Sequence, residues 1–198
     1  MTETDAPTTV RRGPGRPPST HAQEAIRVAA RRLFSAKSYG GVSVREVAAA
    51  AGVDPSLVIR HFGSKEALFL QTMTVDESFR GLVEGPLEEL GRLILERLLT
   101  VRGGAAVSTY AALIGAIDRP EVRSYLEASA DRHVVRPLAE RLTGPDRHLR
   151  ARLVATQVNG LLFDLRGRPD AGLAGRPTAE VLQVYARALQ ALIDDPTA

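Results

Sequence analysis

Side chains that can hydrogen-bond to DNA bases recur along one side of a short segment, Pro55 to Phe62 (PSLVIRHF). A helical rotation of about 100° per residue turns Val58 and Phe62 inward and leaves Ser56 and Arg60 on the outward side. Serine and arginine both hydrogen-bond to base edges in the major groove, which is wide enough to admit a helix. The segment therefore predicts a helix that reads DNA sequence.

A second chemical feature follows directly, at Gly63-Ser64-Lys65. Gly63 ends one helix and Ser64 can cap the next, which places Lys65 in its first turn. A cation in that turn opposes the helix dipole unless an anion lies nearby. A DNA phosphate would supply the anion, because it could accept from free backbone N–H groups and pair with the lysine.

Local signals also predict the helix that must hold the reading helix in place. Ser43 and Glu46 have the spacing of a capping box, so a helix is expected to start after Ser43. Gly52 can adopt the left-handed conformation that ends it. Asp54 and Pro55 then provide an N-cap and a first helical residue. The order helix, short glycine-containing turn, helix is the helix-turn-helix plan.

At these residues the chain resembles the TetR family of bacterial transcriptional regulators. The similarity rests on Leu33 to Phe69, LFSAKSYGGVSVREVAAAAGVDPSLVIRHFGSKEALF, through its glycine spacing, His-Phe pair and Ser-Lys-Glu cap. It implies an all-α fold, with an N-terminal three-helix helix-turn-helix DNA-binding domain followed by a helical ligand-binding and dimerisation domain.

The resemblance also implies which residues contact double-stranded DNA. Ile59 stands where the family most often has tyrosine, so an apolar contact with a thymine methyl is expected there. Lys65 is expected to hold a phosphate, and Ser43 joins the set at the start of the first helix. The remaining expected contacts are Val44, Arg45, Pro55, Ser56, Leu57, Arg60 and His61.

Positive charge is concentrated toward the amino terminus. Residues 1–65 hold ten Lys and Arg against five Asp and Glu, whereas the remainder holds 16 against 18. A basic region is the electrostatic footprint of nucleic-acid binding. Arginine abundance alone is weak support, because 24 of the 26 basic residues are arginine, as GC-rich coding also produces.

Residues 1–18 are interpreted as a flexible basic arm, since Arg11 to Pro18 (RRGPGRPP) is too rich in glycine and proline for a helix. Its Arg16, within Gly-Arg-Pro, is typical of arms that lie along an A·T-rich minor groove. The alternative is a solvated tail.

Residues 19–65 are assigned to the DNA-binding domain and residues 66–198 to the ligand-binding and dimerisation domain. Hydrophobic periodicity predicts helices throughout and no strand. A helix at Lys65–Val83 is expected to connect the two domains, and Asp118 with Glu121 is expected to cap a later one. The other expected helices span 20–37, 86–100, 105–117, 118–142 with a kink at Pro137, 146–166 and 178–193.

The last two helices are predicted to form the interface of a homodimer, as a four-helix bundle. Their apolar faces comprise Leu149, Leu153, Thr156, Gly160, Phe163, Leu182, Tyr185 and Leu189. The alternative is that these faces only cover the chain's own core. Two reading helices spaced about one DNA turn apart would match a palindromic operator.

A small-molecule effector is expected between the helices of residues 86–165. The candidate ligand-binding residues are Tyr110, Leu113, Ile117, His133 and Asn159, although a lone polar residue on such a helix is more often a satisfied core or interface group. Mostly apolar neighbours favour an apolar ligand with few hydrogen bonds.

Enzymatic function is not expected, because the chain has no cysteine, no HExxH, GxSxG or phosphate-binding glycine motif, and four scattered histidines. No cofactor or metal is expected. The amino terminus is no signal peptide and no apolar stretch would span a membrane, so a cytoplasmic protein is expected. The sequence favours a repressor released from its operator by a ligand. The alternatives are an architectural protein that coats A·T-rich DNA with its arm, and a ligand-binding module whose helix-turn-helix is vestigial.

Overall fold

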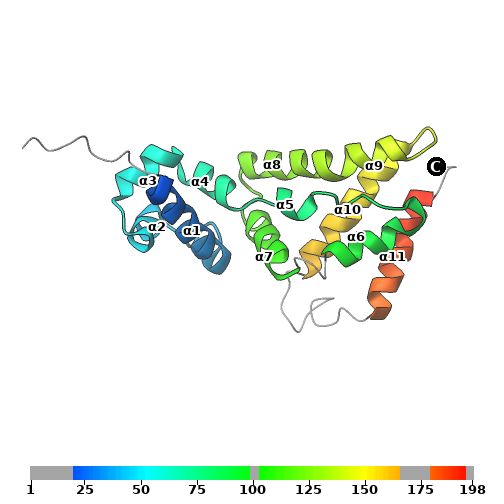
Figure 1. The fold of residues 1–198 in the computed structure, drawn as a ribbon, viewed down its shortest axis with the longest axis horizontal. Coiled ribbons are helices and arrows are strands. Elements are labelled where there is room, and N and C mark those ends of the chain that lie inside the picture. The colour runs from blue at the N-terminus through cyan, green and yellow to red at the C-terminus, as the bar shows by residue number, and fades with distance from the viewer. Residues whose placement is uncertain (1–19, 99–102, 166–178, 195–198) are drawn as a thin grey trace, which may run out of the picture.

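The computed structural model describes residues 20–98, 103–165 and 179–194, and within these ranges every regular element is a helix (Figure 1). The all-α class is thereby confirmed. Four helices form an amino-terminal unit at one end of the molecule, and the rest form a larger bundle. The unit consists of α1 (Thr20–Lys37), α2 (Val44–Ala51), α3 (Pro55–Phe62) and α4 (Lys65–Thr72). None of the described helices has both the length and the apolar content that a membrane span needs.

An aromatic cluster holds the amino-terminal unit together. The Phe34 ring on α1 meets the Phe69 ring on α4 edge-on, with centroids 4.9 Å apart, and Tyr39 meets Phe69 at 5.1 Å. Ile26 and Val58, also almost completely buried, extend this core to α1 and α3. Such rings add burial and specific edge-to-face contact, so α1 acts chiefly as a support for the helices after it.

The predicted caps around α2 and α3 are confirmed. The Glu46 backbone N–H donates to Ser43 Oγ at 3.2 Å, and the Ser43 N–H donates to Glu46 Oε2 at 2.8 Å, which completes the capping box. Gly52 ends α2 with φ of 67°, and Asp54 accepts the Ser56 N–H at 2.7 Å. These local bonds set where α2 ends and α3 begins.

The Glu46 carboxylate makes the stability of this unit depend on pH. Its hydrogen bonds with Lys37 and Ser43 lower its pKa from 4.5 to about 2. A folded-state pKa below the unfolded value contributes stability above the unfolded pKa, and that contribution is lost as pH falls from 4.5 toward about 2. We expect acid to reduce the free energy of unfolding less in Glu46→Gln than in the native chain. Urea unfolding across this pH range measures the difference, and parallel losses would contradict it.

The expected single helix Lys65–Val83 is wrong. Helix α4 ends at Thr72, and the short α5 (Asp76–Phe79) follows after a break in which Met73 has φ −106° and ψ 82°. Side-chain hydrogen bonds explain the break, because they tie the first residue of α5 to another helix.

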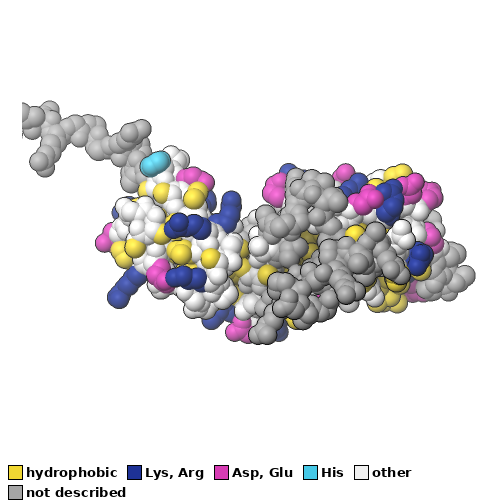
Figure 2. All heavy atoms as spheres, turned by 90° about the horizontal axis from the view of Figure 1, so that it is seen from below, with side chains coloured by type: hydrophobic (Ala, Val, Ile, Leu, Met, Phe, Trp, Pro, Cys, Tyr) yellow, Lys and Arg dark blue, Asp and Glu magenta, His cyan; other side chains and the backbone are white. Residues whose placement is uncertain are grey.

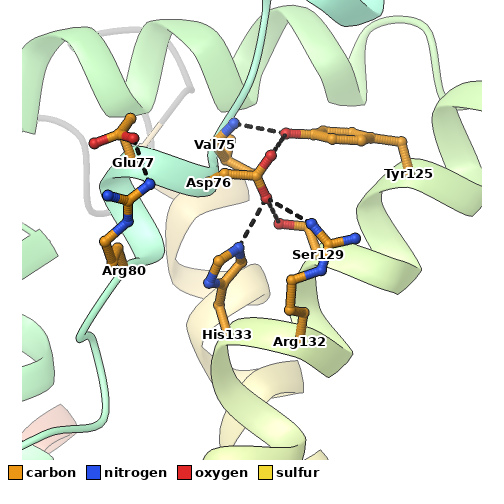
Figure 3. A network of polar contacts seen from close by, with 8 residues as sticks. All are labelled: Val75, Asp76, Glu77, Arg80, Tyr125, Ser129, Arg132 and His133. Carbon is orange, nitrogen blue, oxygen red and sulfur yellow. Dashed lines mark hydrogen bonds and ion pairs between the residues drawn. The ribbon is translucent and has the colours of Figure 1, made fainter.

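Figure 3 shows these bonds converging on Asp76. Its carboxylate accepts from the hydroxyls of Tyr125 and Ser129, both at 3.2 Å, and Oδ1 lies 2.8 Å from Nε2 of His133. The Tyr125 hydroxyl also accepts the Val75 backbone N–H at 2.9 Å. Although burial raises it, the pKa of Asp76 is lowered overall by these hydrogen bonds, chiefly that of His133. Residues 49 to 57 positions after Asp76 therefore decide where the connecting helix stops.

The helices that supply this network run along one edge of the second unit. Helix α8 (Pro120–Ala130) passes through a π-helical turn, η3 (Asp131–Val135), into α9 (Arg136–Arg141). The predicted capping box of Asp118 and Glu121 is wrong, since α8 starts one residue later, with Arg119 at the N-cap and no side-chain cap bond. Pro120 explains the register, because proline is favoured in the first helical turn. A kink was expected at Pro137. The structure has the widened η3 turn just before this residue, which itself lies in α9.

The remaining helices complete the second unit. They are α6 (Leu90–Glu96), preceded by the 3-10 helix η1 (Leu87–Glu89), then α7 (Gly103–Ile114), α10 (Arg147–Leu165) and α11 (Ala179–Asp194). Helices α6 and α11 pack closely at Gly91, where an added Cβ would lie 2.4 Å from the Ala186 carbonyl oxygen. The Gln190 side chain accepts the Gly91 N–H and donates to the Leu87 carbonyl, both at 2.8 Å.

Candidate functional site

The outward face of α3 has the orientation that the sequence predicts. Ser56 and Arg60 are exposed, while Val58 and Phe62 are 1% and 4% exposed. Ile59 is 45% exposed, so an apolar side chain lies beside the two polar ones. A helix that presents donors and an apolar group to solvent in one patch has the chemistry needed for base edges and thymine methyls.

The other predicted DNA contacts are spread over the ends of α2, α3 and α4. Most are exposed or half-buried and none is fully buried. The His61 Nε2 atom is buried without a hydrogen-bond partner among the described residues. Arg16 lies outside the described residues. The exposed set is Ser43, Arg45 and Pro55, and the half-buried set is Val44, Leu57, His61 and Lys65.

At the start of α4, the predicted phosphate lysine rests on an aromatic ring. The Ser64 hydroxyl caps the helix by accepting the Ala67 N–H at 3.0 Å. The Lys65 Nζ atom lies 4.0 Å from the Tyr39 ring centroid, a cation–π contact. The Tyr39 hydroxyl donates to Glu66 Oε1 at 2.5 Å. This arrangement leaves the ammonium half-buried beside a helix N-terminus, where an anion would be stabilised.

The ionisation of this cluster follows from its packing. Burial and then the hydrogen bond to Glu66 raise the pKa of Tyr39 to about 12, so its hydroxyl stays protonated at neutral pH. The hydrogen bond from Tyr39 lowers the pKa of Glu66. Burial, followed by the charge of Arg119, lowers the pKa of Lys65. A nearby phosphate would offset part of the free-energy cost of keeping Lys65 charged, because an opposite charge favours the ammonium form.

Some arginines of α1 have structural partners. The Arg27 guanidinium lies 5.6 Å from the Phe62 ring centroid, and Arg31 Nε donates to the Thr72 carbonyl at 3.3 Å. Both contacts fasten α1 to the helices that carry the candidate interface. Figure 2 shows Lys and Arg side chains standing out from the amino-terminal unit, with acidic side chains among them.

A small cavity of about 180 Å³ lies in the second unit, between α5, α7, α8 and α10. Phe79 and Tyr110 line it and are 3% and 4% exposed, and burial raises the pKa of Tyr110 to about 12. Charged side chains surround it from α8 and α10. They are Arg123, Glu127 and Arg152. The lining therefore combines apolar side chains with charged and polar groups that could orient a small ligand.

Three of the five predicted ligand residues line this cavity, namely Tyr110, Ile117 and Asn159. Leu113 does not, because it is completely buried in the core. His133 does not either, because its ring is held by Asp76. Leu113 and His133 therefore lie outside this cavity. The charged lining residues were missed, although an i, i+4 spacing on a predicted helix places Arg123 and Glu127 on one side.

A larger groove of about 530 Å³ lies between α6 and α11, lined by residues such as Leu95, Leu182 and Ala186. It lies at the end of the molecule opposite the amino-terminal unit (Figure 1), so a ligand there would be far from the candidate DNA contacts. The smaller cavity is adjacent to α5, the next helix after α4, and is therefore the better candidate for an effector site.

The predicted dimer face on α10 is exposed in the single chain. Leu149, Leu153 and Phe163 are 54%, 40% and 58% exposed, and Thr156 and Gly160 are exposed between them. This contiguous apolar strip is unusual for a surface that faces only water.

The α11 part of the predicted face needs one correction. Leu189 is completely buried within its own chain, so it cannot contact a partner. Leu182 and Tyr185 are half-buried, and the Tyr185 hydroxyl donates to the Gln157 carbonyl of α10 at 2.6 Å. Helix α11 thus combines core packing with partial exposure.

Two family models match the chain. The model described as bacterial regulatory proteins, tetR family, matches residues 26–72, and the model described as tetracyclin repressor-like, C-terminal domain, matches residues 88–193. A search of curated protein sequences found no match.

Solved structures of the same fold resemble most of the chain. A TetR-family regulator from Streptomyces coelicolor A3 is 31% identical, with 92% of this chain and 100% of that chain covered and a TM-score of 0.61. NalD, the secondary repressor of the MexAB-OprM multidrug efflux pump in Pseudomonas aeruginosa, is 20% identical, with coverages of 85% and 95% and a TM-score of 0.62. The multidrug binding protein EbrR, complexed with malachite green, is 22% identical, with coverages of 90% and 100% and a TM-score of 0.69.

Proposed function

Because the chain belongs to the TetR family of transcriptional regulators, we propose that it is a dimeric repressor released from a palindromic DNA operator by a small, largely apolar compound. A regulator of this family is not an enzyme, so its function depends on binding alone. We further expect it to act in the cytoplasm, where its operator would lie.

The observation that carries the proposal is the geometry of the α3 face. Ser56, Ile59 and Arg60 are exposed together, and Lys65 lies at the next helix N-terminus. The first group suits base edges, and the second suits a phosphate on the same duplex. Together they would fix both the position and the sequence preference of a helix in the major groove.

Release by a ligand is supported by the cavity between α5, α7, α8 and α10. A compound that binds the non-operator arrangement more tightly would shift the population away from DNA. EbrR binds malachite green, which makes this dye a reasonable first probe for an apolar effector.

Selection of bound fragments from random DNA, followed by gel shift against unselected competitor, tests the proposal. We expect a palindromic site with two half-sites about one helical turn apart, bound at least roughly 1,000-fold more tightly than competitor. Equal affinity for all sequences would instead favour an architectural protein that coats DNA. No affinity at low salt would overturn both readings.

Lys65→Ala should weaken binding to every DNA sequence alike. A phosphate contact carries no sequence information, so operator and competitor affinities should fall by the same factor. The slope of log affinity against log salt should flatten by about one, because one fewer counterion is released. A salt series by fluorescence anisotropy measures both quantities. Lys37→Ala is the matched control, because Lys37 pairs with Glu46 at 2.9 Å. An unchanged salt slope in Lys65→Ala would remove the phosphate role.

A further inference from the structure

Arg119 joins the second unit to the amino-terminal unit at the base of α4. Its guanidinium lies 4.4 Å from the Tyr39 ring centroid, the same ring that Lys65 Nζ approaches at 4.0 Å. Arg119 Nη1 lies 3.7 Å from Glu66 Oε1, the atom that accepts the Tyr39 hydroxyl proton. Two cations therefore share one ring and its carboxylate, and the charge of each acts on the other.

The turn that carries Arg119 also lines the cavity. Ile117 and Arg123, two residues before and four after, both line the cavity between α5, α7, α8 and α10. The turn is held as a unit, since the Arg119 N–H donates to the Ala116 carbonyl at 3.1 Å and the Arg123 N–H donates to the Arg119 carbonyl at 3.0 Å. Pro120 restricts the backbone further. A displacement of Ile117 or Arg123 should therefore displace Arg119.

We propose that Arg119 is the positioning residue through which occupation of this cavity changes the surroundings of Lys65. A compound in the cavity shifts the turn, Arg119 moves relative to the Tyr39 ring and Glu66, and the ammonium of Lys65 is repositioned. This inference rests on the proposed function, because Lys65 matters to regulation only if it holds an operator phosphate.

The arrangement at Arg119 is suited to such a role because it is incompletely satisfied. The Arg119 Nε atom is buried without a hydrogen-bond partner among the described residues. An unpaired buried donor costs free energy, so a movement of this side chain that lets the N–H find a partner would be favoured. A packed element with two accessible arrangements can transmit a small shift between sites.

The lysine content of the chain permits a direct measurement without DNA or effector. Lys37 and Lys65 are the two lysines of the sequence. Reductive methylation of the full-length protein with ¹³C-formaldehyde gives each a separate NMR signal, assigned with Lys65→Arg. The Tyr39 ring should shift the Lys65 signal, whereas Lys37, exposed and paired with Glu46, is the internal control.

The first arm tests the contact itself. Arg119→Ala, or Arg119→Gln should the first variant fold poorly, is expected to move the Lys65 signal and to raise the Lys65 pKa, since a nearby positive charge is removed. Asp118→Ala, an exposed change in the same turn, should leave both unchanged. An unaltered Lys65 signal in both Arg119 variants would overturn the proposal.

The second arm tests transmission, with a larger side chain in the cavity in place of a compound. Ala130→Leu, or Ala155→Leu on the α10 side of the cavity, should move the Lys65 signal and leave Lys37 in place. The same substitution combined with Arg119→Ala should lose this movement. No movement in the native background, or equal movement in both backgrounds, would overturn the proposal. Failure of the operator experiment alone would leave this result intact and remove only the proposed function.

Discussion

Arg60→Ala should weaken operator binding by about 1 to 3 kcal/mol, or roughly five- to 150-fold, and relax the sequence preference at the base pairs that Arg60 reads. Arg60 is exposed on α3 and forms no ion pair among the described residues, so its guanidinium is available for bidentate contact with a guanine. Ser56, one turn earlier on the same side, would contact the neighbouring base pair.

The measurement compares gel-shift affinities of the native chain and Arg60→Ala for the operator and for single-base variants of it. The expected pattern is a large loss on the operator and a small one on sites altered at the position read by Arg60. Arg187→Ala is a suitable control, because it removes an exposed arginine from α11 at the opposite end of the molecule (Figure 1). A uniform loss across all sites, like that expected for Lys65→Ala, would assign Arg60 to the phosphate backbone instead.

The helix-turn-helix could be predicted from the sequence because its geometry is fixed by local bonds. Ser43, Gly52 and Asp54 each act on residues within a few positions, and the structure places each in the cap or turn expected. The inward and outward positions on α3 follow from the rotation of about 100° per residue in an α-helix. Such segments are locally consistent with the final fold, which is the condition under which pattern reasoning works.

The break after α4 could not be predicted, because its cause lies far away in sequence. Apolar periodicity continues through Val75 and Phe79, which favours one long helix. The structure instead ends α4 at Thr72, since Asp76 accepts hydrogen bonds from α8 and interacts with His133 in η3. Contacts across 49 to 57 positions have no local signature, so tertiary packing overrides propensity there.

The candidate effector site illustrates the same limit. Tyr110 and Asn159 were identified as polar residues on apolar helices, which is a property of each helix separately. Their meeting at one cavity, with Phe79 from α5, depends on how three helices cross. Histidine is a residue type that often contacts ligands, yet the His133 ring interacts with Asp76 at the start of α5. Residue type alone does not separate these roles.

Leu153→Glu should convert the chain from a dimer into a monomer and thereby abolish most operator affinity. Leu153 is 40% exposed on α10, between the exposed Leu149 and Thr156. In a symmetric interface the new carboxylate would be buried near its counterpart without a partner, at a cost of several kcal/mol. We expect the dimer dissociation constant to rise by at least about 100-fold, which corresponds to about 2.8 kcal/mol.

The consequence for DNA binding follows from linkage of the two reading helices. When both half-sites are bound by one dimer, the second contact is intramolecular and adds roughly 10² to 10⁴ in affinity. Leu153→Glu should lose this factor on the palindrome yet bind a single half-site as the native protein does. Val28→Glu is the matched control for the measurement of oligomeric state. It adds the same carboxylate at a side chain that is 59% exposed on α1, away from α10. Sedimentation equilibrium should show a dimer for Val28→Glu and a monomer for Leu153→Glu. A dimeric Leu153→Glu would mean that the exposed α10 face is not the surface that joins two copies.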